Sequence, residues 1–106
     1  MGSTVIVDAE NVRRSLWPNL SREELVERAR AWAAREGHDL RIVFDGPPPE
    51  EAPDLVGSNY ADDEIVRLAT ELEGPVWVAT SDRGLRARLS GRVDRIIGGG
   101  RFARSL

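Results

Sequence analysis

"TVIVDAEN", residues 4–11, is an apolar run that ends on an aspartate and has an asparagine three places later. Residues 4–7 are short, β-branched and bounded by polar residues, which predicts a buried strand. The residues that follow Asp8 are expected to form a loop. A carboxylate and an amide at the end of a buried strand suit a protein interior poorly, so Asp8 and Asn11 need a reason to be there.

Three further runs of the same kind are predicted to be strands: LRIVF at 40–44, PVWVAT at 75–80, and DRIIGGG from about residue 94. The first of them is followed directly by Asp45. The second is followed by Ser81 and Asp82. Polar residues therefore recur where the predicted strands end.

Helices are predicted between these strands. Over residues 20–37, Ser21 and Glu24 form a capping box and Gly37 is a stop signal. Over 60–74, apolar residues recur at i, i+3, i+4 and i+7, and Gly74 ends the pattern. A shorter helix is predicted over 82–91 and a last helical turn over 101–106.

Strands that alternate with helices indicate right-handed βαβ units and a parallel sheet covered on both faces. The proline-rich segment 46–60 interrupts the alternation and is expected to be an exposed loop, with DLVGS at 54–58 as an edge strand. A chain of 106 residues with 41% hydrophobic residues suits one core, so residues 1–106 are expected to form a single domain.

Composition excludes several kinds of site. The chain has no cysteine and one histidine, His38, so a disulfide framework and a zinc site built from thiolates or histidines are excluded. A metal would have to be held by oxygen. The net charge of −3 argues against a general polyanion-binding protein, and all the positive charge is arginine. No apolar stretch is long enough to span a bilayer, so no membrane association and a cytoplasmic location are expected.

The aspartates at the strand ends predict a cation site. The carboxyl ends of parallel strands share one edge of the sheet, so Asp8, Asp45 and Asp82 should converge there. Asp62 begins the second helix near the same edge, with Asp63 behind it. Clustered carboxylates repel one another unless a cation lies between them, and Mg²⁺ or Mn²⁺ prefers oxygen ligands.

A purely structural role is the alternative for each of the converging aspartates. Asp8 can simply end its strand, Asp62 and Asp82 can act as helix caps, and Asp45 before Gly-Pro-Pro can be a turn residue. Asp62 shares a helix face with Ile65, three residues on, so Asp62 is expected to point inward and Asp63 toward the flank. Asn11 can orient Asp8 or a ligand.

The ordered motifs resemble a known family. VIVDAENV (5–12), LWPNL (16–20), IVFDG (42–46), ADDEIVRLA (61–69), VWVATSDRGLR (76–86) and GGGRFAR (98–104) resemble, in that order, the NYN domain. This is a PIN-like ribonuclease family, and the likeness is greatest to its YacP-type branch. The match covers nearly the whole chain. Residues 9 and 10 are Ala-Glu where that branch more often has Gly-Tyr, and the 46–60 loop is short for it.

The resemblance implies an α/β fold, a three-layer α/β/α PIN-like domain with a mainly parallel central sheet. It implies a hydrolase, a Mg²⁺- or Mn²⁺-dependent endoribonuclease that cleaves RNA phosphodiester bonds. The matching positions assign catalysis to Asp8, Asn11, Asp62 and Asp82, with Asp8, Asp62 and Asp82 as metal ligands. Asp63 and Asp45 would act on the metal through water.

Substrate contacts are expected from residues that leave the same edge of the sheet: Ser81, Arg13, Arg14, Arg83, Arg86 and Arg101. Trp17 is expected to pack in the core or anchor a loop, with stacking on an unpaired base as the alternative, while Trp32 and Trp77 are expected in the core. RNA is the expected partner, with a ribosome or another protein as a further candidate. The rival hypothesis is a PIN-like module that binds RNA or a protein without cutting.

Overall fold

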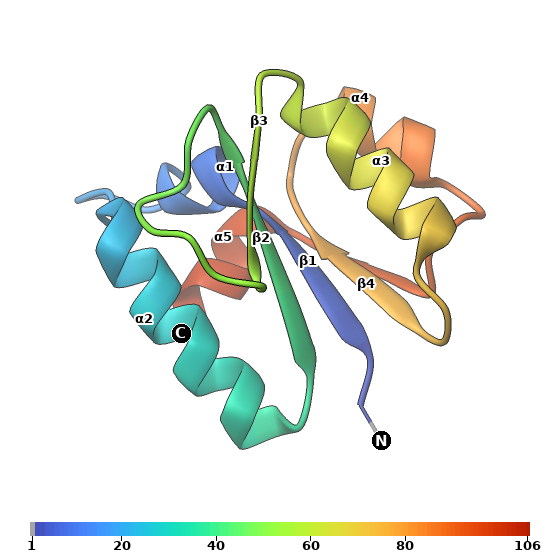
Figure 1. Ribbon diagram of the computed structural model, residues 1–106. Coiled ribbons are helices and arrows are strands. Elements are labelled where there is room, and N and C mark those ends of the chain that lie inside the picture. The colour runs from blue at the N-terminus through green and yellow to red at the C-terminus, as the bar shows by residue number, and fades with distance from the viewer. Residues whose placement is uncertain (1) are drawn as a thin grey trace.

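The computed structural model describes residues 2–106 and contains one five-stranded sheet. Its strands are β1 (Thr4–Asp8), β2 (Asp39–Asp45), β3 (Leu55–Ser58), β4 (Val76–Ala79) and β5 (Arg95–Ile97). The strand order is β3-β2-β1-β4-β5, and every neighbouring pair is parallel. Figure 1 shows β1 crossing the middle of the molecule between β2 and β4. The stretch at residues 4–8 is thus the central strand.

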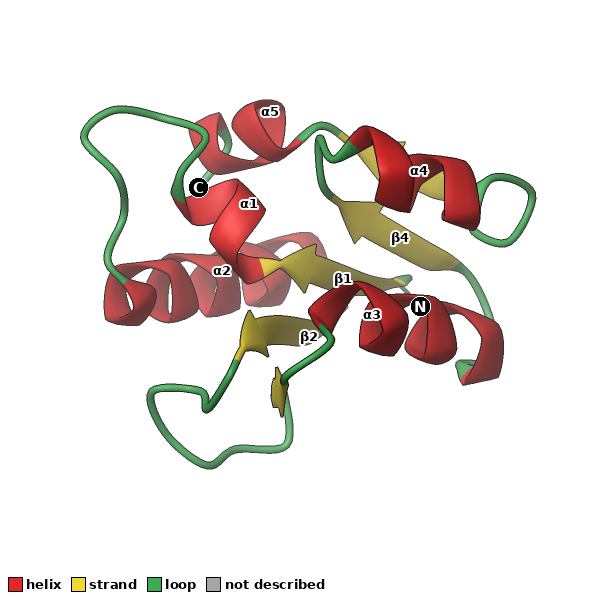
Figure 2. Ribbon diagram, turned by 90° about the horizontal axis from the view of Figure 1, so that it is seen from above, coloured by secondary structure: helices red, strands yellow, loops and turns green. Residues whose placement is uncertain are grey.

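Helices cover both faces of this sheet. They are α1 (Ala9–Arg13), α2 (Arg22–Glu36), α3 (Ala61–Glu71), α4 (Arg83–Leu89) and α5 (Gly99–Arg104). Figure 2 shows α1, α2 and α5 on one face and α3 with α4 on the other. The predicted three-layer α/β/α architecture with a parallel central sheet is confirmed.

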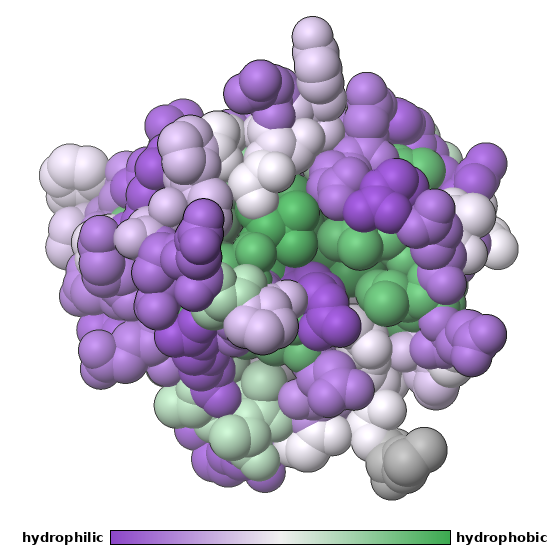
Figure 3. Space-filling view, viewed as in Figure 1, coloured by the Kyte–Doolittle hydropathy of each residue, from purple (hydrophilic) through white to green (hydrophobic). Residues whose placement is uncertain are grey.

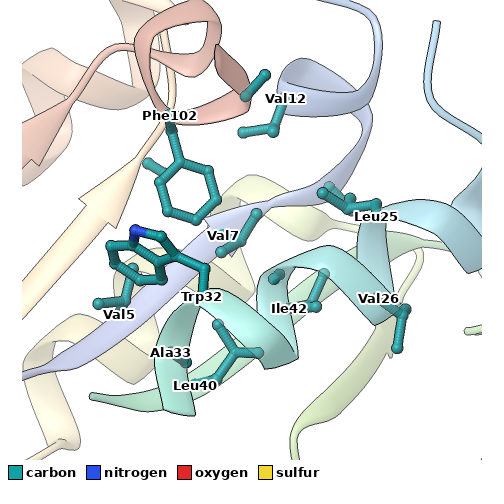
Figure 4. Packing of buried hydrophobic residues seen from close by; sticks show 14 of the residues in the cluster. Val5, Val7, Val12, Leu25, Val26, Trp32, Ala33, Leu40, Ile42 and Phe102 are labelled. Carbon is teal, nitrogen blue, oxygen red and sulfur yellow. The ribbon is translucent and has the colours of Figure 1, made fainter. Parts of the chain in front are cut away.

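Alternation along the strands produces two apolar layers. Val5 and Val7 of β1 pack beneath α2 and α5, whereas Ile6 between them packs beneath α3 and α4. In the first layer, shown in Figure 4, the Trp32 and Phe102 rings meet edge to face at 4.9 Å between centroids. Both faces of β1 are therefore buried, which explains its continuous β-branched sequence.

Helix α2 begins and ends at its predicted signals. The Ser21 hydroxyl accepts from the Glu24 N–H at 3.0 Å, and the Ser21 N–H donates to the Glu24 carboxylate at 2.9 Å. Gly37 ends the helix in the left-handed conformation, at φ +76°. The capping box and the glycine stop are confirmed.

Two expectations near the first strand are wrong. The residues after Asp8 form the short helix α1 and not a loop. Ala9 and Val12, three residues apart, are both buried, and Glu10 pairs with Arg13 along the helix. A five-residue helix is too short for a periodic signal in the sequence. Trp17 is 89% exposed and does not pack in the core, whereas Leu16 and Leu20 on either side of it pack against the core.

The proline-rich loop and edge strand occur as predicted. Strand β3 lies at the sheet edge, and ion pairs from Arg30 of α2 to Asp54 (2.8 Å) and Glu50 (3.2 Å) fasten the loop. Figure 3 shows a mainly hydrophilic surface, with apolar residues visible between β3 and α3. Within residues 2–106, no helix is long and apolar enough to cross a membrane.

Candidate active site

Strand order places a crevice beside the end of β1. The chain runs from β1 to β2 and β3 on one side, then crosses to β4 and β5 on the other. In open parallel sheets, ligands bind beyond the carboxyl ends of the strands where this reversal occurs. A cavity of about 610 Å³ lies there. Its lining residues are Asp8, Glu10, Asn11, Arg14, Ser15, Asp45, Asp62, Ser81, Asp82 and Gly100.

Asp8 is the most buried of the four aspartates in this cavity. It ends β1 with 7% of its surface exposed, and its Oδ2 accepts a hydrogen bond from the Thr80 hydroxyl at 2.8 Å. Burial raises the pKa of Asp8 to about 6, the Thr80 hydrogen bond opposes the rise, and the negative charges of the other three aspartates add to it. Ionised Asp8 is thus poorly stabilised by the protein alone.

Thr80 joins the two strands that border the crevice. Its hydroxyl is fully buried, donates to Asp8, and accepts from the Asp82 N–H at 3.1 Å. One hydroxyl can donate once and accept twice, so both bonds form together. The sequence prediction gave Thr80 no role, although it belongs to the T-S-D motif directly after β4. The hydroxyl fixes the orientation of the Asp8 carboxylate.

Asp82 has the cap role that the sequence offered as an alternative. It is the N-cap of α4, and its Oδ1 accepts from the Leu85 N–H at 2.8 Å. It also lines the cavity. A carboxylate has two oxygens with several lone pairs, so capping leaves Asp82 able to accept from, or bind, a further group.

Asp62 and Asp63 are both exposed, and of the two only Asp62 lines this cavity. Asp62 lies in the first turn of α3, lines the cavity and is not the cap, since the N-cap is Tyr60. Burial raises the pKa of Asp62, the charge of Asp82 adds to this, and Arg88 opposes it. Asp63 does not line this cavity and pairs with Arg88 at 2.8 Å. Asp45, the last residue of β2, is exposed at the cavity rim.

Asn11 and Ser81 tie three chain segments together. The Asn11 Oδ1 accepts from the Ser81 N–H at 2.8 Å, and the Ser81 hydroxyl accepts from the Gly99 N–H at 2.7 Å. A Cβ on Gly99 would lie only 2.4 Å from the Asn11 Oδ1, so a larger residue there would displace the Asn11 amide from its hydrogen bond with Ser81. In the structure Asn11 thus orients the Ser81 segment and brings the starts of α1, α4 and α5 together.

The predicted substrate arginines fall into two groups. Arg14 lines the cavity and is 64% exposed, and both Arg14 and Arg13 pair with Glu10, at 3.3 and 2.9 Å. The hydrogen bond from Arg13 holds the pKa of Glu10 below its ordinary value. Three others, Arg83, Arg86 and Arg101, are exposed on α4 and α5 and do not line the cavity. Glu10, which the sequence prediction left without a role, thus orders the arginines beside the cavity.

The donor set restricts which metal the cavity would suit. Its candidate ligands are carboxylate and amide oxygens, which Mg²⁺ and Mn²⁺ prefer. Among the described residues, no three acidic, histidine or cysteine side chains form a group that could hold an ion. Mg²⁺ usually binds one or two carboxylates and completes its shell with water and substrate phosphates. The lining residues fit a cation bound by one or two carboxylates and completed by water and phosphate. They do not fit a cation enclosed by protein ligands alone.

The fold and the cavity define a three-layer α/β/α domain with aspartates at the switch point of its parallel sheet. A crystal structure of Rae1 (YacP) from Bacillus subtilis, of a tryptophan-to-leucine mutant, is similar at a TM-score of 0.81 and 20% sequence identity. The match covers 97% of this chain and 74% of that chain, and it shows that this chain has a YacP-like fold. Neither the scan against protein-family models nor the search of curated proteins found a match.

Proposed function

We propose that this protein is a metal-dependent ribonuclease that cleaves RNA phosphodiester bonds. One observation carries the proposal: four aspartates, each at the end or start of a different strand or helix, line one cavity at the switch point of the sheet. The YacP-like fold and the ordered resemblance to PIN-like ribonucleases support it.

Mg²⁺ or Mn²⁺ is the proposed cofactor, held by Asp8, Asp62 and Asp82, with Asp45 and Asp63 acting through water. When bound, such an ion would supply charge stabilisation to the phosphate and lower the pKa of a coordinated water. The raised pKa values of Asp8 and Asp62 support a cation partner, because a positive charge stabilises the ionised carboxylates that burial and mutual repulsion disfavour.

The remaining residues position these groups. Thr80 holds the Asp8 carboxylate by its hydroxyl, and the Asn11–Ser81 hydrogen bond keeps the β4–α4 connection beside β1. Arg14, exposed at the rim, can bind a phosphate of RNA that enters the cavity. No side chain is needed as a nucleophile, because a positioned water can attack the phosphorus.

The second candidate is a module that binds RNA or a protein, such as a ribosomal component, without cutting. Two observations favour it. Asp82 already caps α4, and the described residues contain no ready group of three metal ligands. A test of RNA cleavage, and not a test of RNA binding, therefore distinguishes the two functions.

The test is cleavage of end-labelled single-stranded RNA by the purified full chain, with Mg²⁺, with Mn²⁺ and with EDTA. Asp8→Asn keeps the size of the side chain and removes its charge. Asp39→Asn is the matched control, because Asp39 is exposed at the start of β2, whereas the cavity lies beyond the carboxyl ends of the strands. We expect metal-dependent cleavage that Asp8→Asn abolishes and Asp39→Asn retains. Equal cleavage by the wild type and Asp8→Asn would sink the proposal, and binding without cleavage would support the module.

A further inference from the structure

A second pocket, of about 440 Å³, adjoins the carboxylate cavity and shares Asp45 and Asp62 with it. Its other lining residues are Asn59, Tyr60, Ala61, Asp63 and Arg88. We propose that this pocket binds one unpaired nucleotide of the RNA, next to the phosphate in the cavity, with its base stacked on Tyr60 and its phosphate bound by Arg88. This inference rests on the proposed function and names the substrate contacts beside the same site.

The side chain of Tyr60 is exposed to solvent. The residue is 74% exposed, and with Trp17 it is one of two large apolar side chains exposed in residues 2–106. Its backbone is nevertheless fixed, since its N–H donates to the Ser58 hydroxyl and its carbonyl accepts from the Glu64 N–H, both at 3.0 Å. A solvent-exposed aromatic ring on a fixed backbone can serve as a platform on which an unpaired base stacks.

Arg88 supplies the positive charge that a phosphate needs in this pocket. It is the one cation among the lining residues, beside Asp45, Asp62 and Asp63. Its pairing with Asp63 is solvent-exposed, with side-chain exposures of 46% and 67%, and exposed pairs of this kind are weak. A guanidinium has five N–H donors, so Arg88 can bind a phosphate oxygen while it still contacts Asp63.

The two pockets together favour single-stranded nucleic acid. They share Asp62, in the first turn of α3, and Tyr60 lies two residues before it in the sequence, in the connection from β3 to α3. This connection is at the top of Figure 1. An RNA strand with one phosphate beside Asp62 can therefore place its neighbouring nucleotide in the pocket that Tyr60 lines. Paired bases in a duplex hide their faces, whereas an unpaired base offers a face to stack. An aromatic face next to a guanidinium suits that chemistry.

The experiment measures RNA binding by full-length Asp8→Asn protein in Mg²⁺, so that cleavage does not interfere. The probe is a fluorescent single-stranded RNA oligonucleotide. Three further proteins each add one substitution to the Asp8→Asn parent: Tyr60→Ala, Tyr60→Phe or Arg88→Gln. Loss of one base–aromatic stack corresponds to about a 5- to 150-fold rise in Kd for Tyr60→Ala. Tyr60→Phe, which keeps the ring, should stay within about threefold of its parent. Arg88→Gln should weaken binding and reduce its salt dependence.

An abasic nucleotide moved along the oligonucleotide identifies the contact. At one position of the oligonucleotide, the effects of the abasic nucleotide and of Tyr60→Ala on Kd should not add, because both changes remove the same stacking contact. Unchanged Kd for Tyr60→Ala, with metal-dependent cleavage by the wild type, overturns this subsite and leaves the proposed function intact. A Tyr60-dependent Kd without cleavage by the wild type supports the subsite and contradicts the nuclease. No RNA binding by any variant, together with no RNA cleavage by the wild type, overturns both.

Discussion

Replacing Asp8 by asparagine should stabilise the metal-free protein at neutral pH. Burial and three neighbouring aspartates raise the pKa of Asp8 from an ordinary 3.8 to about 6 in the folded state. A carboxyl group with a raised folded pKa favours folding when it is protonated, so its contribution is complete below about pH 4 and is lost as pH rises through about 6. The introduced amide carries no charge and can still accept from Thr80.

The magnitude follows from the difference between the two pKa values. At about 1.4 kcal/mol for each pH unit, a difference of about two sets an upper bound near 3 kcal/mol at pH 8. We expect Asp8→Asn to raise the free energy of unfolding by about 1 to 3 kcal/mol at pH 8, which is about 5 to 15 °C in Tm for a domain of this size.

The assay is thermal and urea unfolding of the wild type and Asp8→Asn in EDTA, at pH 4 and pH 8, with Asp39→Asn as control. The stabilisation should appear at pH 8 and nearly vanish at pH 4. Added Mg²⁺ should stabilise the wild type, by about 2.7 kcal/mol at a hundredfold excess over its Kd, and should stabilise the variant much less. An Asp8→Asn protein no more stable than the wild type at pH 8 in EDTA would refute the electrostatic reasoning.

Three further variants test other parts of the site. Thr80→Val should lower the free energy of unfolding by about 1 to 3 kcal/mol, because a buried carboxylate and a backbone N–H lose their partner, and NMR titration should show the carboxylate pKa rising further. Gly99→Ala should lower Tm, since its Cβ would meet an amide oxygen at 2.4 Å, whereas Gly100→Ala meets nothing closer than 3.5 Å and should leave Tm nearly unchanged; equal Tm values contradict the contact. Asp62→Asn should nearly abolish cleavage, and Asp63→Asn should reduce it by at most about 10- to 100-fold, the range for groups that act through a ligand. The reverse order in cleavage assays would mean that the two roles are exchanged.

Local signals in the sequence predicted most of the elements. The capping box at Ser21, the glycine stop at Gly37 and the short β-branched strands each depend on residues a few positions apart, which is why they could be read without the fold. Helix α1 gave no such signal, because five residues span little more than one turn and show no period. Trp17 was misplaced because a large apolar side chain in a loop carries no local mark of exposure.

The sequence by itself determined the alternating strands and helices and the positions of Asp8, Asp62 and Asp82 at their junctions. Tertiary structure alone decided what these residues touch. The hydrogen bond from Thr80 to Asp8 spans 72 residues, and that from Ser81 to Asn11 spans 70. Such contacts depend on β4 crossing to the far side of β1, and strand order is set by packing of the whole sheet and its two helical layers. Periodicity reports which face of an element is buried, and it does not report which distant element covers that face.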